Sequence, residues 1–186
     1  MNLLKGINHY RADPMGWFGS AVMLGFAGYA LWRWHLSGFI FFLLLVLRDI
    51  VAAWFLLTRN QSVVKSTSRF AEVLAYVSSG WAFLYLSADQ RAAAASLIAS
   101  CLSILGFTLS TLALFDLGKS FGVSPANRGL VRTGVYRYLK HPMYVGYVIS
   151  EVGFIFLNPW NAVLWGFSML LYVVRARLEN QVLRKM

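Results

Sequence analysis

The stretch GVYRYLKHPMY, from Gly134 to Tyr144, gathers an arginine, a lysine, a histidine and three tyrosines between two strongly apolar segments. Pro142 suits the first turn of an α-helix, because its missing N–H has no hydrogen bond to lose there. The apolar residues that follow Tyr144 would continue this helix into lipid. We therefore expect a polar loop that ends at the mouth of a membrane helix.

The composition of the whole chain is that of an integral membrane protein. Of its 186 residues, 59% are hydrophobic and 13% are charged, and the mean hydropathy is +0.60. A soluble domain carries about a quarter charged residues. The net charge of +10 would suit nucleic acid, but the basic residues fall between apolar spans. We therefore expect membrane lipids as the surroundings and no nucleic acid as a partner. Cys101 is the single cysteine, which excludes an intrachain disulfide and a cysteine zinc site.

Apolar segments set the expected number of helices. A membrane span needs about 20 apolar residues, and two shorter segments flank a turn signal at Asn158–Pro159. The sequence predicts an all-α integral membrane protein with about six transmembrane helices, the last two forming a tight hairpin. Five spans result if one early segment does not cross. The predicted spans are Trp17–Trp34, Gly38–Leu57, Phe70–Leu86, Ala92–Phe115, Tyr144–Leu157 and Trp160–Val174.

The basic residues predict the orientation in the membrane. Cytoplasmic loops of membrane proteins carry an excess of lysine and arginine. With six spans and both termini in the cytoplasm, most of the 17 basic residues lie inside, and Arg33, Asp89 and Arg91 lie at the outer turns. The N-terminus lacks the apolar core of a cleavable signal peptide, so we expect the first span to act as the insertion signal. The inner residues are Lys5, Arg11, Arg59, Lys65, Arg69, Lys119, Arg128, Arg132, Arg137, Lys140, Arg175, Arg177, Arg184 and Lys185.

The hairpin brings distant polar residues together. His141 and Arg175 are equally far from Asn158 in the sequence, so an antiparallel hairpin should place them side by side at its inner end. Glu179 follows Arg175 by one helical turn on the same face. The glycine-rich loop between residues 116 and 141 reaches the same place. The spacing therefore predicts a polar pocket at the inner membrane surface.

The chemistry of this pocket suits a charged ligand. The start of the helix at Pro142 offers free N–H groups and a dipole that favour a carboxylate or phosphate. Arg175 could bind a carboxylate in bidentate fashion. Glu179 could accept a hydrogen bond from an amine or a ribose hydroxyl. Tyr136 and Tyr144 offer flat faces for a base or a cation.

Each of these residues also has a plain structural interpretation. Arg175 and Glu179 could form a surface pair, worth only a few tenths of a kcal/mol. Tyr136, Tyr138 and Tyr147 could be interfacial aromatics, and His141 could cap a helix. The hairpin favours the pocket, because it explains why all of them meet at one place.

The polar stretches resemble a known enzyme family. LVRTGVYRYLKHPMYVGY (Leu130–Tyr147), then NP at Asn158, then RARLENQVL (Arg175–Leu183) resemble the isoprenylcysteine carboxyl methyltransferase family, which is related to membrane phospholipid N-methyltransferases. Two positions depart from its pattern. Lys140 replaces an arginine before His-Pro, and Asn180 replaces a second glutamate.

The resemblance implies S-adenosylmethionine as the cofactor, bound at the cytoplasmic membrane face. Glu179 would contact the cofactor and Arg175 the substrate nucleophile, and these two residues would be catalytic. Residues 1–115 would form variable helices around a substrate tunnel, and residues 116–186 the cofactor loop, the hairpin and the catalytic helix, as one structural unit. The residues implied to bind the cofactor are Glu179, Leu130, Val131, Tyr136, His141, Pro142 and Tyr144, with Arg128, Gly129 and Met143 as their neighbours.

The acceptor expected from the resemblance is a lipophilic carboxylate such as an isoprenylcysteine. A carboxylate with a pKa of about 4 needs no base at neutral pH. The alternatives are a phospholipid amine or a small thiol, which Glu179 or His141 would have to deprotonate. A non-catalytic membrane binding protein on the same fold is a further alternative. The sequence leaves the oligomeric state open.

Charged residues also lie within the expected spans. Arg48 and Asp49 fall in the second span, and Glu151 falls in the fifth. Ionisable residues inside a membrane usually face a partner or a cavity. Two interpretations carry equal weight: Arg48 pairs with Glu151 to hold the helices together, or Arg48 lines the substrate tunnel.

Overall fold

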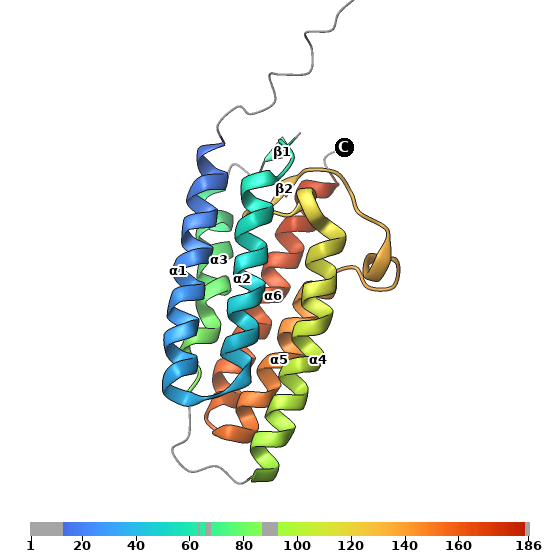
Figure 1. Ribbon diagram of the computed structural model, residues 1–186. Helices are drawn as coiled ribbons and strands as arrows, with labels where there is room; N and C mark the ends of the chain where they lie inside the picture. The colour runs from blue at the N-terminus through green and yellow to red at the C-terminus, as the bar shows by residue number, and fades with distance from the viewer. Residues whose placement is uncertain (1–12, 63, 66–67, 87–92, 185–186) are drawn as a thin grey trace, which may run out of the picture.

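The computed structural model describes residues 13–62, 64–65, 68–86 and 93–184. Within these ranges the chain forms a bundle of α-helices (Figure 1). Lys5, Arg11, Asp89, Arg91 and Lys185, which enter the orientation argument, lie outside the described residues. The α-helices are α1 (Pro14–Ser37), α2 (Ile40–Thr58), α3 (Arg69–Gly80), α4 (Ala93–Leu117), α5 (Pro142–Leu157) and α6 (Asn161–Leu183). The 3-10 helices are η1 (Trp81–Leu84), η2 (Gly118–Ser120) and η3 (Gly134–Arg137).

The long segment between α4 and α5 crosses one end of the bundle (Figure 1). The start of α1 and the end of α6 lie at this same end. Two short strands, β1 (Val64–Lys65) and β2 (Ala126–Asn127), pair there in an antiparallel ladder. The all-α prediction did not include this ladder, which attaches the segment before α3 to the crossing loop.

Local signals fix the α1–α2 hairpin. Asp13 caps α1 by accepting a hydrogen bond from the N–H of Gly16 at 3.2 Å. Gly38 ends α1 in the left-handed region with φ of 62°, and its N–H donates to the carbonyl of Trp34. The carboxylate of Asp13 also pairs with Arg59 at 2.8 Å. The beginning of α1 is therefore tied to the end of α2.

Small residues bring α4 and α5 into close contact. A Cβ atom added at Gly106 would collide with the backbone of Gly146 and Ser150, and one added at Gly153 would come within 2.8 Å of the carbonyl of Ala99. Helices in membranes commonly approach through such small residues. This contact fixes the position of α5, which begins directly after His141 and carries Tyr144 in its first turn.

The outer surface of the bundle is apolar. Large hydrophobic side chains are exposed along several helices, and a soluble monomer rarely exposes so much contiguous apolar surface. Lipid would cover such side chains. They include Trp17, Phe18, Leu24 and Leu36 on α1, Leu97, Leu105 and Leu112 on α4, and Val163, Phe167 and Leu170 on α6.

Two of the described helices are long and apolar enough to cross a membrane. They are α2 and the segment Ala93–Ser120, which comprises α4 and η2. α5 is apolar but shorter. The structure thus agrees with a helical membrane protein, whereas the count of about six spans stays a prediction.

The third predicted span, Phe70–Leu86, is not one continuous α-helix. α3 ends at Gly80 and a 3-10 helix follows. The hydroxyls of Ser78 and Ser79 donate to the carbonyl of Ala75 at 3.0 and 2.8 Å. Such back-bonding competes with the helix ladder, and Gly80 weakens the helix further.

The predicted hairpin of the last two helices is present. α5 ends at Leu157, and the carbonyl and side-chain oxygens of Asn158 accept hydrogen bonds from Asn161 and Trp160 across the turn. α6 runs to Leu183, beyond the predicted end of its apolar segment at Val174. The longer helix carries Arg175 and Glu179 toward the crossing loop.

Candidate functional site

A cavity of about 690 Å³ lies where the crossing loop meets the helix ends. Its size falls in the range of small-molecule sites, about 300–1,000 Å³. Every residue that the sequence analysis placed at the site lines this cavity except Pro142, which is buried as the first residue of α5. The residues predicted and found there are Arg128, Gly129, Leu130, Val131, Tyr136, His141, Met143, Tyr144, Arg175 and Glu179.

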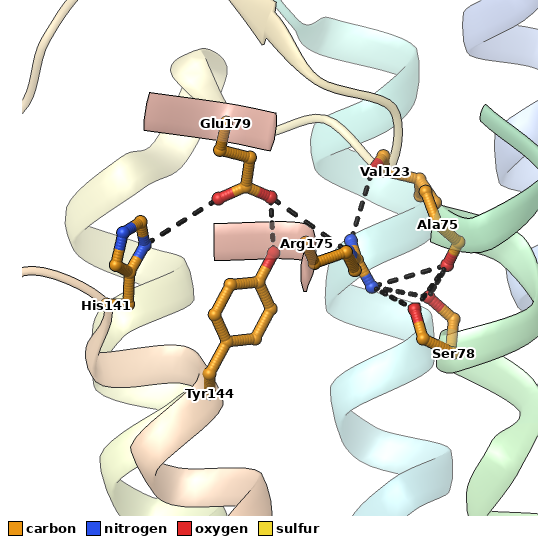
Figure 2. A network of polar contacts seen from close by, with 8 residues as sticks. Ala75, Ser78, Val123, His141, Tyr144, Arg175 and Glu179 are labelled. Carbon is orange, nitrogen blue, oxygen red and sulfur yellow. Dashed lines mark hydrogen bonds and ion pairs between the residues drawn. The ribbon is translucent and has the colours of Figure 1, made fainter. Parts of the chain in front are cut away.

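The carboxylate of Glu179 is the centre of the polar contacts (Figure 2). Tyr144 donates its hydroxyl to Oε1 of Glu179. Nδ1 of His141 lies 3.7 Å from Oε2, and Nε of Arg175 lies 4.0 Å from Oε1. The side chain of Glu179 is 25% exposed. A carboxylate that is partly exposed to the cavity can accept a hydrogen bond from a ligand.

Aromatic rings and one guanidinium build the wall below this carboxylate. The rings of His141 and Tyr144 are stacked with centroids 5.6 Å apart, and Tyr144 stacks on Tyr172 at the same separation. The guanidinium of Arg175 lies 5.3 Å from the ring centroid of Tyr144. Such cation–π contacts favour a fixed position for both groups.

The terminal nitrogens of Arg175 are bound to the protein itself (Figure 2). Nη1 donates to the hydroxyl of Ser78 at 2.9 Å, with longer contacts to Ser79 and the carbonyl of Ala75. Nη2 donates to the carbonyl of Val123 at 3.0 Å. Arg175 therefore connects α6, α3 and the crossing loop in this structure, and its expected contact with the substrate nucleophile stays a prediction.

The hairpin register differs from the prediction by one helical turn. Equal spacing from Asn158 predicted that His141 would lie beside Arg175. His141 instead lies beside Glu179, and Arg175 approaches the other oxygen of the same carboxylate. The offset arises because the turn extends to Trp160 and α6 begins at Asn161. The prediction that these residues meet at one end of the hairpin is nevertheless confirmed.

Specific contacts hold the crossing loop over the cavity. The N–H of Val135 donates to the carboxylate of Asp116 at 2.7 Å. Gly134 has a φ of 56°, and a Cβ there would collide with that carboxylate. Only glycine fits this position without strain. On the other side of the loop, Ser120 donates to the carbonyl of Arg128 at 3.3 Å.

Burial shifts the pKa of two ionisable groups in the loop. Burial, together with the neighbouring positive charge of Arg59, lowers the pKa of the Arg128 guanidinium to about 10. Burial also raises the pKa of the Tyr136 hydroxyl above its usual range, as do Tyr147 and Glu179. Both pKa shifts arise chiefly because these two side chains are largely buried.

Cationic groups dominate the described residues that line the cavity. Glu179 is the single carboxylate among them. Such a distribution of charge favours an anionic ligand over a cationic one. The cationic residues are Arg48, Arg128, Arg132, Arg137, Lys140 and Arg175.

Several lining residues come from helices to which the sequence analysis assigned no site residue. Met23 of α1, Ala52 of α2 and Leu114 of α4 add apolar surface, and Ser79 of α3 adds a hydroxyl. Hydropathy alone could not identify them, because each is an ordinary member of an apolar span. Asn180, which departs from the family pattern, also lines the cavity.

The structure decides between the two interpretations of Arg48. Arg48 pairs with Asp49, not with Glu151, and it lines the cavity. The carboxylate of Glu151 accepts hydrogen bonds from Tyr172 at 2.6 Å and Ser168 at 2.7 Å. Arg48 is therefore a cavity residue, and Glu151 is stabilised by uncharged donors.

Unpartnered polar atoms gather at the cavity. Within the described ranges, few buried side-chain nitrogens or oxygens lack a hydrogen-bond partner, and most of them belong to residues that line it. Buried polar groups without partners are costly and call for an explanation. A polar ligand in the cavity would provide these partners. The atoms are Nε of Arg48, Nε of Arg128, Nε2 of His141 and Nε of Arg175.

Comparison with known proteins bears on the identity of this site. No curated protein and no solved structure gives a significant match to the chain. The profile of the isoprenylcysteine carboxyl methyltransferase (ICMT) family matches residues 97–185, which comprise nearly all of α4, the crossing loop, α5 and α6. This match supports a methyltransferase of the membrane, and it confirms the resemblance: residues 97–185 match the isoprenylcysteine carboxyl methyltransferase family.

Proposed function

We propose that this protein is an S-adenosylmethionine-dependent methyltransferase that methylates the carboxylate of a lipophilic, isoprenylcysteine-like acceptor. The observation that carries the proposal is the cavity in which Glu179 is surrounded by His141, Tyr144 and Arg175. All four residues belong to the segment that matches the family. The same segment supplies the loop that covers the cavity.

The residues of the cavity fit the cofactor that the family implies. Glu179 offers a carboxylate to an ammonium group or to ribose hydroxyls, and Tyr136 offers an aromatic face for a base. His141 has an unpartnered Nε2. Its side chain makes no capping hydrogen bond to α5 and so does not close the start of that helix. The donor set thus suits a nucleoside that carries an amino acid.

When bound, S-adenosylmethionine supplies a methyl group on a sulfonium. The methyl group would pass to the acceptor's carboxylate oxygen and leave S-adenosylhomocysteine, while Glu179, Tyr136 and His141 would hold the cofactor in place. No proton is transferred, since a carboxylate with a pKa of about 4 is already ionised. The protein's own tasks are to orient the two ligands and to exclude water.

The charge of the cavity supports a carboxylate acceptor over an amine. The lining residues carry several cations and the single described carboxylate, Glu179. Apolar side chains of the N-terminal helices, among them Met23 and Leu114, would contact the lipophilic part of the acceptor. We further propose that the cavity opens toward the cytoplasm with both termini on that side, which the positions of Arg59, Arg177 and Arg184 favour.

A methyl-transfer assay tests the proposal. The protein in lipid nanodiscs is incubated with S-adenosylmethionine carrying a labelled methyl group and with one of three acceptors: N-acetyl-S-farnesylcysteine, its carboxamide, or phosphatidylethanolamine. We expect label in the base-labile methyl ester of the first acceptor alone. Label in the phospholipid amine would indicate an N-methyltransferase. No transfer to any of them, together with no cofactor binding, would indicate a binding protein on this fold.

A further inference from the structure

One of the arginines that line the cavity lies outside the segment that matches the family. Arg48 lies on α2, outside residues 97–185. It is 6% exposed, it lines the cavity, and its Nε has no hydrogen-bond partner. A guanidinium so deeply buried is costly unless it has a function or a full set of partners.

Arg48 lies one helical turn deeper than the contacts around Glu179. Its guanidinium carbon is 5.1 Å from the ring centroid of Tyr147. Tyr147 follows Tyr144 by three residues on α5, and the two ring centroids are 6.4 Å apart. Arg48 and Arg175 therefore contact neighbouring rings of one aromatic wall. A ligand that extends inward from Glu179 would reach Arg48 next.

The two arginines differ in what they can offer a ligand. Both terminal nitrogens of Arg175 donate to protein acceptors on α3 and the crossing loop. Nη2 of Arg48 donates to Asp49, whereas its Nε has no hydrogen-bond partner. An arginine side chain has five N–H donors. Nε has no hydrogen-bond partner in either arginine, but the terminal nitrogens of Arg175 could bind a ligand only by giving up their contacts with the protein.

The acidic residues near Arg48 do not face the cavity. Asp49 is fully buried and is not among the lining residues. Glu151 lines a separate, much smaller cavity of about 10 Å³ behind Arg48 and Tyr147. Its carboxylate is occupied by hydroxyl donors, among them Tyr85 at 3.0 Å. The group presented to a ligand at this depth is the guanidinium.

We propose that Arg48 determines acceptor specificity by binding the carboxylate of the methyl acceptor within the bundle. This inference rests on the proposed function and names the residue that selects the substrate class. One carboxylate oxygen would accept hydrogen bonds from Arg48 while the other faces the methyl group. The apolar side chains of Met23, Ala52 and Leu114 line the same cavity and would contact the lipophilic chain. A head group without an acceptor oxygen at this place would leave the buried Nε of Arg48 without a hydrogen-bond partner.

The test measures direct binding of the acceptor, so that it does not depend on turnover. Removing Arg48 alone would leave Asp49 buried without its counter-charge, so the variant is the double substitution Arg48→Gln with Asp49→Asn. The matched control is Asp49→Asn alone, which keeps the guanidinium. Calorimetry in nanodiscs compares N-acetyl-S-farnesylcysteine with its carboxamide. S-adenosylhomocysteine binding and thermal unfolding of each variant are measured beside them.

We expect the double variant to bind the acid about 10- to 100-fold more weakly, the range for hydrogen bonds to charged groups. Carboxamide binding should change by less than about threefold, and Asp49→Asn should retain the preference for the acid. If the double variant does not fold, Arg48→Lys is measured in its place. This variant should lose affinity for the acid but not for the carboxamide, because lysine lacks the planar guanidinium that binds both oxygens of a carboxylate.

Two results would overturn the inference. In the first, the double variant loses affinity for the acid and for the carboxamide to the same extent. In the second, the acid binds the variants as tightly as the wild type, or binds none of these proteins. Failure of the proposed function is a separate result. It appears as no binding of S-adenosylhomocysteine to the wild-type protein, whatever happens with the acid.

Discussion

Replacing Arg175 with methionine should lower the stability of the bundle as well as its activity. The guanidinium is 6% exposed and donates to Ser78 at 2.9 Å and to Val123 at 3.0 Å, with two longer contacts on α3. Methionine has a similar length and would retain much of the packing. It would leave the acceptors of α3 and the crossing loop without a donor.

The size of the effect follows from these contacts. A hydrogen bond to a charged group contributes about 1.5–3 kcal/mol, and removing one member of a buried polar network costs about 3–5 kcal/mol. For a chain of this size, 1 kcal/mol shifts the melting temperature by about 2–4 °C. We therefore expect Arg175→Met to melt about 10 °C below the wild type.

Arg177→Met is the matched control, because Arg177 lies on the same helix and is exposed. Thermal unfolding of both variants in nanodiscs, followed by intrinsic tryptophan fluorescence, gives the comparison. Arg177→Met should melt within about 2 °C of the wild type, as is usual for exposed positions. If the two variants melted together, the contacts of Arg175 would not hold the helices and the loop in place. Loss of acceptor binding at unchanged stability would instead assign Arg175 to the substrate.

Three further predictions concern the helix contact, the buried cation and the departure from the family pattern. Gly106→Val should destabilise the protein by at least about 2 kcal/mol, because the new side chain would collide with the backbone of α5. The control Gly166→Val, at a position with open space around it, should change stability little in the same unfolding assay. Arg128→Leu should raise the melting temperature, since burial lowers the pKa of that guanidinium to about 10 and so its charged form opposes folding at neutral pH; a lower melting temperature would show that the charge is compensated. Asn180→Glu should tighten binding of S-adenosylhomocysteine about three- to tenfold by adding a carboxylate to the cavity for the ligand's ammonium group, and calorimetry that showed weaker binding would contradict this.

The hairpin and its pocket could be predicted because their signals are local. Asn158–Pro159 marks the turn, and Pro142 marks the start of α5. From these two positions, spacing alone brings His141 and Glu179 to the same end. The exact register could not be obtained in this way, since it depends on how many residues the turn uses before Asn161 begins α6.

The partners of Arg175 and Arg48 could not be predicted, because they depend on how distant helices pack. Ser78 and Val123 lie far from Arg175 in the sequence and carry no pattern that points to it. Asp49 neighbours Arg48 on α2, yet adjacent residues on a helix do not normally face each other. Whether an arginine inside a span meets a partner or a cavity is decided by the surrounding helices.

Hydropathy also overestimated the regularity of the third span. Phe70–Leu86 is apolar enough to suggest one helix, but apolarity does not report where hydroxyl side chains bind the backbone. Ser78 and Ser79 do so just before Gly80, where α3 ends. The hydroxyls of the same two serines accept hydrogen bonds from Arg175. Ser78 and Ser79 therefore contribute both to the end of α3 and to the position of Arg175.

The central claim is that the carboxylate of Glu179 binds the cofactor. The most direct measurement is a calorimetric titration of S-adenosylhomocysteine into the purified protein, beside Glu179→Gln and the control Glu72→Gln, which makes the same change outside the cavity. The account predicts micromolar binding to the wild type and the control, weakened about 10- to 100-fold in Glu179→Gln by the loss of charged hydrogen bonds. Equal affinity in all three proteins, or no binding to the folded wild type, would contradict it.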